Sequence, residues 1–374
     1  MPLARNREGS LGTRDSPLAE SSSSPYRLDS SIAVDSPAYE TYLRARRLWN
    51  QRSSESVVDS IAYFQRAIEL DSTFAPAYVG LAMAFVSAGG NTLTQSVDVA
   101  EVRGPALAAA RRALELDEAR GDAHAALAQV LERLYPWSAE TDILIEQAYR
   151  RAIDLSPDDA DARLWYGNYL SVHGRSDHAI DQYRAALRLD PSSPNIGSRL
   201  GAALVDAGQT AEGLARLEET VARHPQQFNA RIRLAWADVS LGRFDAAEHQ
   251  FSAAEQISPE SVPARVGIAF IAARSGDTER ARGMLEALLP AIEQVGDPYL
   301  AAIVFVALRD RDNAITWLSR AAENSRALRR PSAYGIRSPM YDWLRDDPRF
   351  VELQREIETV MTAAEVPGSA ETVL

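Results

Sequence analysis

Residues 161–191 read DARLWYGNYLSVHGRSDHAIDQYRAALRLDP, which is the pattern of two short helices joined by a tight turn. In the first half, Leu164, Tyr166 and Leu170 recur at helical spacing, with the small residue Gly167 between them. Gly174 then marks the end of this helix, because glycine readily adopts the positive φ of a helix C-terminal cap. The first half is therefore predicted to be one amphipathic helix.

The second half of the stretch predicts a second helix. Ser176 or Asp177 is expected to be its N-cap, since both side chains can accept a hydrogen bond from the first helical turn. Pro191 is expected to end it, because proline lacks a backbone N–H. Its apolar face consists of Ala179, Ile180, Tyr183, Ala186 and Leu187. A hairpin with so little apolar surface cannot fold alone and must stack on neighbours.

The same features return every 34 residues. Three classes of position share this period: prolines at Pro157, Pro191, Pro225 and Pro259, glycines at Gly174, Gly208, Gly242 and Gly276, and small residues at Ala179, Gly213, Ala247 and Ala281. Four units thus follow one another without insertion over residues 160–293. Further units, some with insertions, are predicted at residues 38–72, 75–118, 121–159 and 298–324. In the last of these, Arg309 stands where the others have the turn glycine.

The two ends of the chain differ from this array. Residues 1–36 are rich in Ser, Pro and charge and predict a disordered tail, as do residues 364–374. Residues 325–363 predict a cap for the array at residues 37–324. In the cap, Asp347 serves as an N-cap, Pro348 as the first helical residue, and Phe350, Leu353 and Ile357 form one apolar face. Tyr334, Met340, Tyr341 and Trp343 are expected either to cover the end of the stack or to fill its groove as a plug.

Composition excludes several classes of function. The chain has no cysteine, a formal net charge of -12 and a pI near 5.1, which argue against a thiolate metal site and against binding to nucleic acid or anionic lipid. No apolar run is long enough to span a membrane. The five histidines do not have the spacing of a zinc site, and there is no phosphate-binding loop or nucleophile elbow. The carboxylates at residues 158–161 fit an N-cap better than acid–base catalysis. We therefore expect no catalytic residue, metal or cofactor, and a protein that is not an enzyme.

The 34-residue period and its alternation of small and large positions resemble the tetratricopeptide repeat. Three sequence segments resemble a particular bacterial module of such repeats: AYETYLRARRLWNQR at 38–52, ALAAARRALELDEARGDAHAALAQVLE at 106–132, and DDPRF at 346–350. In that family the module commonly forms the C-terminal part of winged-helix transcriptional activators, adenylate cyclases and serine/threonine kinases. The resemblance covers residues 37 to about 360. It implies an all-α fold, a right-handed solenoid of about eight helical hairpins with a C-terminal capping helix.

The resemblance also implies where a ligand would bind, because first helices of such repeats line a concave groove. The matching positions here include Val79, Met83, Gln129, Leu164, Asn168, Ile232, Trp236, Val266, Phe270 and Tyr299, and Arg199 and Arg233 beside them are also assigned to the groove. Asn168 matches a position at which relatives hold a peptide backbone. The basic residues that some relatives use to bind carboxylates are missing at Leu164 and Ser198, although Arg199 and Arg233 lie one position further on.

An apolar groove containing Met83, Trp236 and Phe270 favours a hydrophobic or helical segment as the ligand. The alternative is that Trp236 and Phe270 pack between repeats. The function expected is a cytoplasmic scaffold that binds a peptide or helix of another protein. A second hypothesis is a sensor module acting in trans on a transcription regulator, kinase or cyclase, a signalling effector that would be encoded nearby. No effector domain precedes the module, so the effector activities of the family are not expected here.

Overall fold

The computed structural model of the chain describes residues 36–51, 53–90, 98–135, 138–324, 336 and 338–362. Within these residues every regular element is helical, with seventeen α-helices, one 3-10 helix and no strand. The all-α fold predicted from the sequence is confirmed. The predicted disordered tails at residues 1–36 and 364–374 lie outside the described residues, apart from Ser36.

The first sixteen α-helices form eight consecutive antiparallel hairpins, as the sequence predicts. The pairs are α1 (Pro37–Gln51) with α2 (Ser54–Leu70), α3 (Ala75–Gly90) with α4 (Val99–Leu116), α5 (Gly121–Leu134) with α6 (Ala139–Leu155), α7 (Ala160–Val172) with α8 (Ser176–Leu189), α9 (Pro194–Asp206) with α10 (Thr210–Arg223), α11 (Phe228–Ser240) with α12 (Phe244–Ile257), α13 (Val262–Arg274) with α14 (Thr278–Val295), and α15 (Tyr299–Ala307) with α16 (Arg311–Asn324). The 3-10 helix η2 (Pro339–Leu344) and α17 (Pro348–Thr362) follow them.

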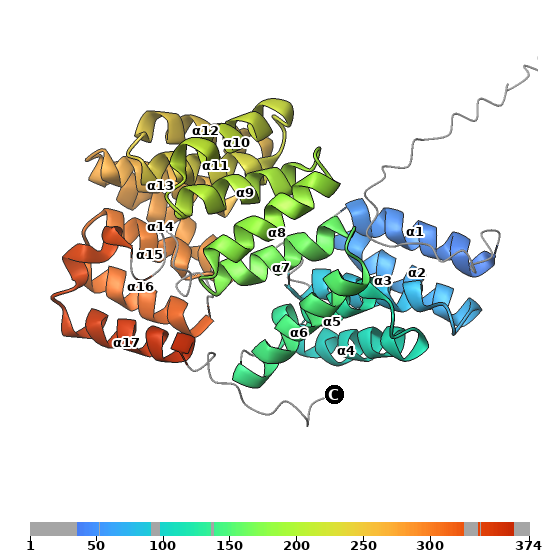
Figure 1. Cartoon of the computed structure of the whole chain (residues 1–374). Helices are drawn as coiled ribbons and strands as arrows, with labels where there is room; N and C mark the ends of the chain where they lie inside the picture. Colours follow the sequence, from blue (N-terminus) through green and yellow to red (C-terminus); the bar gives the residue numbers. More distant parts are fainter. Residues whose placement is uncertain are drawn as a thin grey trace, which may run out of the picture.

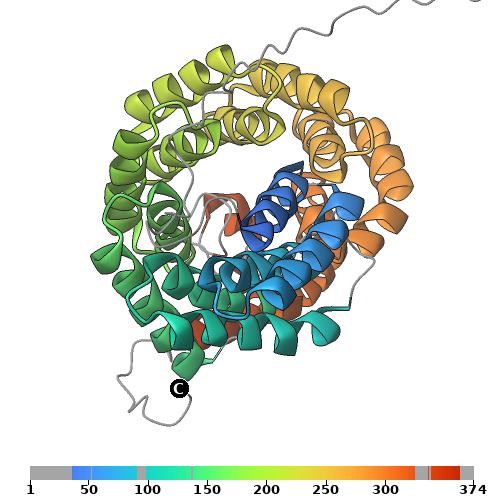
Figure 2. The same cartoon turned by 90° about the vertical axis from the view of Figure 1, so that its right-hand side faces the viewer.

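The hairpins wind into a solenoid that appears in Figure 2 as a ring of two concentric layers, while Figure 1 shows α1 and α17 near opposite ends of it. Many successive first helices contact one another, as α3 and α5, α9 and α11, and α13 and α15 do, to a greater extent than successive second helices. Elements on the shorter, inner circumference lie closer together. The first helices therefore form the inner layer and the second helices the outer layer.

The helix ends follow the local sequence. Gly174 ends the first helix of its hairpin with a φ of 76°, as predicted, and Arg309 adopts the same left-handed conformation with a φ of 58°. Asp159 caps α7, its Oδ1 accepting from the backbone N of Ala162 at 2.9 Å, so the predicted role of this carboxylate is confirmed. The prediction of Ser176 or Asp177 as an N-cap is wrong. Helix α8 begins at Ser176 itself, and its N-cap is Arg175, whose side chain makes no capping hydrogen bond.

Small residues let the two helices of a hairpin approach closely. The ring of Tyr183 on α8 fills the space opposite Gly167 on α7, where a Cβ atom would lie 2.6 Å from the ring. One repeat further on, Gly201 and Gly213 face each other, and a Cβ on Gly213 would lie 2.7 Å from the backbone oxygen of Gly201. The small and large positions of the repeat therefore act as complementary packing surfaces.

The apolar core is not continuous along the solenoid. One large cluster of buried residues extends from Ala38 to Leu204, and another from Ala235 to Ile357. Between them lies a small cluster made of Leu217, Val221, Ala230, Leu234 and Ala237. Helices α10 and α11 thus join two well-packed halves through limited apolar contact.

The C-terminal segment covers the last hairpin. Helix α17 packs on α16 and buries Phe350, Leu353 and Ile357, the face predicted from the sequence. Tyr341 is fully buried and Met340 and Trp343 pack at the edge of the same cluster, whereas Tyr334 lies outside the described residues. The hydroxyls of Tyr341 and Tyr299 lie 3.3 Å apart, so η2 also covers one position that the sequence assigned to the groove.

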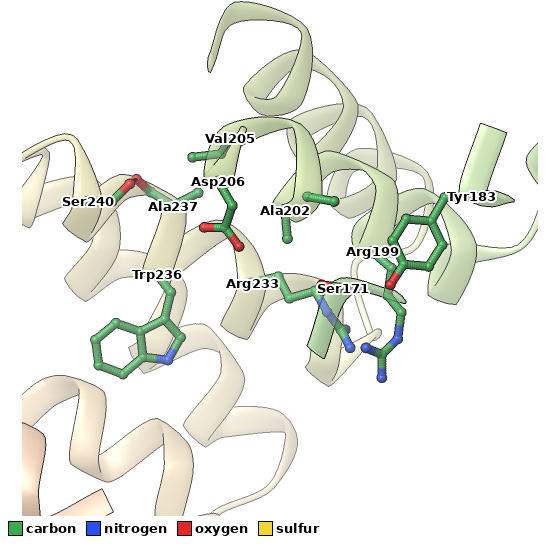
Figure 3. A pocket seen from close by; sticks show the side chains of 11 residues that line it. Ser171, Tyr183, Arg199, Ala202, Val205, Asp206, Arg233, Trp236, Ala237 and Ser240 are labelled. Atoms are coloured by element: carbon green, nitrogen blue, oxygen red, sulfur yellow. Dashed lines mark hydrogen bonds between the residues drawn. The ribbon is translucent and has the colours of Figure 1, made fainter. Parts of the chain in front are cut away.

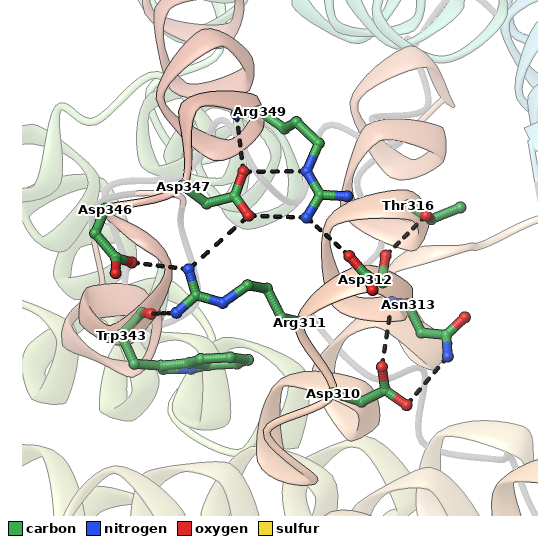
Figure 4. A network of polar contacts seen from close by, with 9 residues as sticks. All are labelled: Asp310, Arg311, Asp312, Asn313, Thr316, Trp343, Asp346, Asp347 and Arg349. Atoms are coloured by element: carbon green, nitrogen blue, oxygen red, sulfur yellow. Dashed lines mark hydrogen bonds and ion pairs between the residues drawn. The ribbon is translucent and has the colours of Figure 1, made fainter.

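Charged side chains tie this cap to α16 (Figure 4). Arg311 contacts Asp346 at 2.9 Å and donates to the backbone oxygen of Trp343 at 3.1 Å. Arg349 contacts both Asp347 and Asp312 at 2.8 Å. The N-cap role predicted for Asp347 is confirmed, since its Oδ1 accepts from the backbone N of Arg349 at 3.0 Å.

Candidate functional site

The inner layer contains a pocket of about 180 Å³ formed where α7, α9 and α11 lie next to one another. Its lining residues are Ser171, Tyr183, Arg199, Ala202, Ala203, Val205, Asp206, Arg233, Trp236, Ala237 and Ser240 (Figure 3). All but Tyr183, which lies on α8, belong to first helices. We call this set the inner pocket.

The 34-residue repeat explains why these residues share one face. Arg199 and Arg233 occupy equivalent positions on α9 and α11, as do Ala202 and Trp236. Asp206 and Ser240 are a third equivalent pair, one helical turn further along. Stacked hairpins place equivalent positions side by side, so each pair forms one step along the inner wall.

Polar contacts fix several of the pocket's side chains. Arg233 donates from Nη1 to the hydroxyl of Ser198 at 3.3 Å and to the backbone oxygen of Asn229 at 3.2 Å. Tyr183 donates its hydroxyl proton to Oδ1 of Asn168 at 3.0 Å. This bond orients the Asn168 amide, leaving its NH₂ group as the donor for any further contact.

Trp236 combines packing with exposure. Its ring meets Phe251 edge-on, with centroids 5.1 Å apart, and meets Phe270 in the same way at 5.4 Å. The indole is nevertheless only half-buried and lines the inner pocket. Phe270 itself is buried. Phe270 therefore packs between repeats, as the alternative interpretation of the sequence predicts. Trp236 packs between repeats too, but part of its ring is exposed in the inner pocket.

The inner pocket brings together three of the twelve residues assigned to the groove from the sequence: Arg199, Arg233 and Trp236. Asn168 is half-buried beside it, and Ile232 packs against the C-terminal core. These positions remain a prediction with respect to ligand binding.

The other assigned positions offer little surface. Val79, Met83, Leu164, Val266 and Phe270 are buried among neighbouring repeats and stabilise the stack. Gln129 is buried and hydrogen-bonded to the Tyr149 hydroxyl, and Tyr299 is buried against Tyr341. An inner-layer helix is enclosed on three sides, so only part of its inner face reaches solvent.

Sequence reasoning missed the residues one turn further along each helix. Ser171, Asp206 and Ser240 follow Asn168, Ala202 and Trp236 by three or four positions and so lie on the same helical face. This spacing was available in the sequence. It would have added a carboxylate and two hydroxyls to the predicted site.

Comparisons with known proteins agree with this geometry. Models described as tetratricopeptide repeat match residues 146–194, 204–254 and 239–304. The chain contains tetratricopeptide repeats. The matched residues include α7, α8 and α10 to α14. They contain most of the inner pocket, while Arg199, Ala202 and Ala203 on α9 lie between two of the matches.

Curated relatives match parts of the chain. Superkiller protein 3 of Schizosaccharomyces pombe is 23% identical over 253 residues, which are 66% of this chain and 17% of the relative. The peroxisomal targeting signal receptor of Eremothecium gossypii is 31% identical over 121 residues, 32% of this chain and 21% of the receptor. The chain thus matches about a fifth of the length of each of these two relatives.

Two solved structures share the fold of this tetratricopeptide chain along most of its length. Yeast Tom70 superposes with a TM-score of 0.51 at 16% identity, covering 89% of this chain and 70% of Tom70. The structure of the APC/C hetero-tetramer Cut9-Hcn1 gives a TM-score of 0.57 at 12% identity, covering 88% of this chain and 57% of the other. At these identities the likeness concerns the helical repeat solenoid alone.

Two further properties of the tetratricopeptide array bear on its chemistry. Among the described residues, no helix is both long and apolar enough to cross a membrane. In the same part of the chain, no group of three or more His, Cys, Asp or Glu side chains is arranged to hold a metal ion.

Proposed function

We propose that this tetratricopeptide array is a protein-interaction scaffold that holds a peptide segment of a partner protein against its inner layer. The inner pocket is the observation that carries this proposal. It combines two guanidinium groups, an indole and a carboxylate on one wall of stacked helices, a mixture suited to the side chains and backbone of a peptide.

The binding mechanism rests on a rigid wall rather than on folding of the receptor. Arg233 and Tyr183 are held by hydrogen bonds within the chain, and Trp236 by its two phenylalanine neighbours. Side chains ordered before binding lose less conformational entropy when a ligand arrives. We propose that the protein acts in the cytoplasm.

A crosslinking experiment tests the proposal. A photoreactive amino acid replaces Ala202 in the inner pocket, and in a matched variant it replaces Ala246 on the outer helix α12. The expected result is a partner peptide, identified by mass spectrometry, that crosslinks at position 202 and not at position 246.

The identified segment is then made as a synthetic peptide and its affinity measured by fluorescence anisotropy. We expect Arg233→Ala to weaken binding about tenfold or more, because it removes charge-assisted contacts, and Arg223→Ala on α10 to leave it unchanged. Equal affinity for both variants would refute the inner pocket as the binding site.

The resemblance to a module of bacterial activators, cyclases and kinases supports a second function, regulation of such an effector in trans. The same crosslinking experiment distinguishes this regulatory function from that of a scaffold. A captured protein with a winged-helix, cyclase or kinase domain supports the regulatory function, and a partner without any of these supports the scaffold alone.

A further inference from the structure

A second pocket, of about 430 Å³, lies on the opposite side of the wall, between the outer helices α6 and α8 and over α7. Its lining residues are Arg150, Ile153, Asp154, Tyr166, Leu170, Arg175, His178 and Gln182. We call it the outer pocket. Its volume is in the range of sites that bind small molecules, and the proposed peptide site does not use it.

One end of the outer pocket holds two arginines that share a single carboxylate. Oε1 of Glu146 lies 2.7 Å from Nη2 of Arg150 and 2.6 Å from Nη1 of Arg175. Tyr166 completes the group, since its hydroxyl accepts from Nε of Arg150 at 3.2 Å and donates to Oε1 of Glu146 at the same distance. Two positive charges and one negative charge leave this group with one positive charge.

The two guanidinium groups retain donors for a ligand. Each has five N–H bonds, and within the described part of the chain Nη1 of Arg150 and Nε and Nη2 of Arg175 make no hydrogen bond. The arginine side chains are 61% and 33% exposed. Burial by itself would raise the pKa of Glu146, but its arginine partners lower it, so this carboxylate stays ionised and holds both guanidinium groups in place.

The rest of the outer pocket differs from the arginine end. Its apolar surface comes mainly from the half-buried Ile153, while Tyr166 and Leu170 are largely buried and contribute only small exposed parts. Helices α6 and α8 run in the same direction, because the antiparallel α7 lies between them in the chain. Asp154 on α6 and Gln182 on α8 therefore both lie one turn or more beyond the arginines, toward the other end.

We propose that the outer pocket binds a small molecule with one carboxylate on an apolar or aromatic body. The carboxylate contacts Arg150 and Arg175, and the body covers Ile153 and the exposed edges of Tyr166 and Leu170. The single excess positive charge at the arginine end matches one carboxylate. Asp154 at the other end brings the net charge of the pocket to zero and so disfavours a dianion such as a phosphate monoester. Arginine forks suit the planar carboxylate in particular.

Ligand-observed fluorine NMR tests this proposal on the full chain. The probe is 4-fluorophenylacetate, with 4-fluorobenzyl alcohol as the neutral match and 4-fluorophenyl phosphate as the dianion. We expect line broadening that saturates for the acid and is absent or at least several-fold weaker for the other two probes. Equal broadening by acid and alcohol, tighter binding of the phosphate, or no saturable binding of the acid would overturn the proposal.

Variants locate the site. Arg150→Gln, at an exposed position where folding is little affected, is expected to weaken binding of the acid about tenfold, and Arg175→Gln likewise. The control is Arg151→Gln, the next residue on α6, which is exposed and does not line the outer pocket. If the acid binds the Arg150→Gln variant, the Arg151→Gln variant and the wild type with equal affinity, its binding site is not the outer pocket. Arg233→Ala in the inner pocket should leave the affinity for the acid unchanged. Failure of the outer-pocket proposal can therefore be distinguished from failure of the proposed peptide site in the inner pocket.

Discussion

Gly167 and Tyr183 form a matched pair across one hairpin, because a Cβ atom on Gly167 would lie 2.6 Å from the Tyr183 ring, closer than such contacts ever come. Tyr183 is almost fully buried and also donates its hydroxyl proton to Asn168. The same pair thus sets the spacing of α7 and α8 and orients a side chain of the inner layer. Packing between the layers and the geometry of the candidate site are coupled here.

Gly167→Ala should therefore destabilise the protein, even though alanine favours helices. Overpacking costs about 1–3 kcal/mol, more than the gain of up to about 1 kcal/mol from helix propensity. The control is Gly283→Ala in α14, where a Cβ would meet nothing within 4 Å, so the free energy of unfolding should rise by about 0.5–1 kcal/mol. Urea unfolding of both variants gives the comparison, and a stabilised Gly167→Ala protein would contradict the packing argument.

Much of the fold was predictable because each structural signal occurs once per repeat, so several copies in the sequence support the same prediction. Gly174 and Pro191 recur in register, and the eight hairpins follow from them. A single helix end is less well determined, as the start of α8 at Ser176 shows. There the turn geometry set by Gly174 decides the first helical residue, and the capping preference of Ser176 and Asp177 does not.

The candidate site was less predictable, for a physical reason. A position that faces the inner layer can be covered by the next repeat or by a segment remote in sequence. Val266 is buried by its neighbours, and Tyr299 by Tyr341 from η2. Helical periodicity gives the direction of a side chain, but the distance between stacked helices decides whether it reaches solvent.

Helices α9 and α10 should be the least stable interior hairpin. They contain Gly197, Gly201 and Gly213 within their helices, each costing up to about 1 kcal/mol relative to alanine. Helix α9 packs into the N-terminal cluster, but α10 contributes only Leu217 and Val221 to the small apolar cluster, which provides little compensating burial. Amide hydrogen exchange should be about tenfold or more faster in α9 and α10 than in α7 and α8. Equal protection of the two hairpins would show that the break in the core has no energetic consequence.

Asp159 should make stability depend on pH. Burial raises its pKa to about 7, with Asp161 and Asp122 adding to the effect, although its Oδ1 accepts a hydrogen bond as the N-cap of α7. Between the unfolded pKa, about 4, and the folded value, the native state binds more protons than the unfolded chain. The free energy of unfolding therefore falls as pH rises through this window, by at most about 4 kcal/mol.

Asp159→Asn keeps an N-cap of similar quality without the buried charge. The variant should be more stable than the wild type at about pH 8, and the difference should shrink toward about pH 4. Urea unfolding across this range measures it, with Asp158→Asn as a control at an exposed neighbouring residue. A stability difference between Asp159→Asn and the wild type that stays constant with pH would rule out a buried, raised-pKa carboxylate at this position.

The capping helix should be needed for the stability of the whole array. Phe350 on α17 is fully buried and packs against Tyr341, whereas the next residue, Val351, is 38% exposed. Phe350→Ala should cost about 3–5 kcal/mol through the cavity it leaves, and Val351→Ala less than about 0.5 kcal/mol. Because a solenoid without its cap exposes an apolar end face, Phe350→Ala should also self-associate. Urea unfolding and light scattering after gel filtration measure the two effects. A monomeric Phe350→Ala protein as stable as Val351→Ala would show that the eight hairpins need no cap.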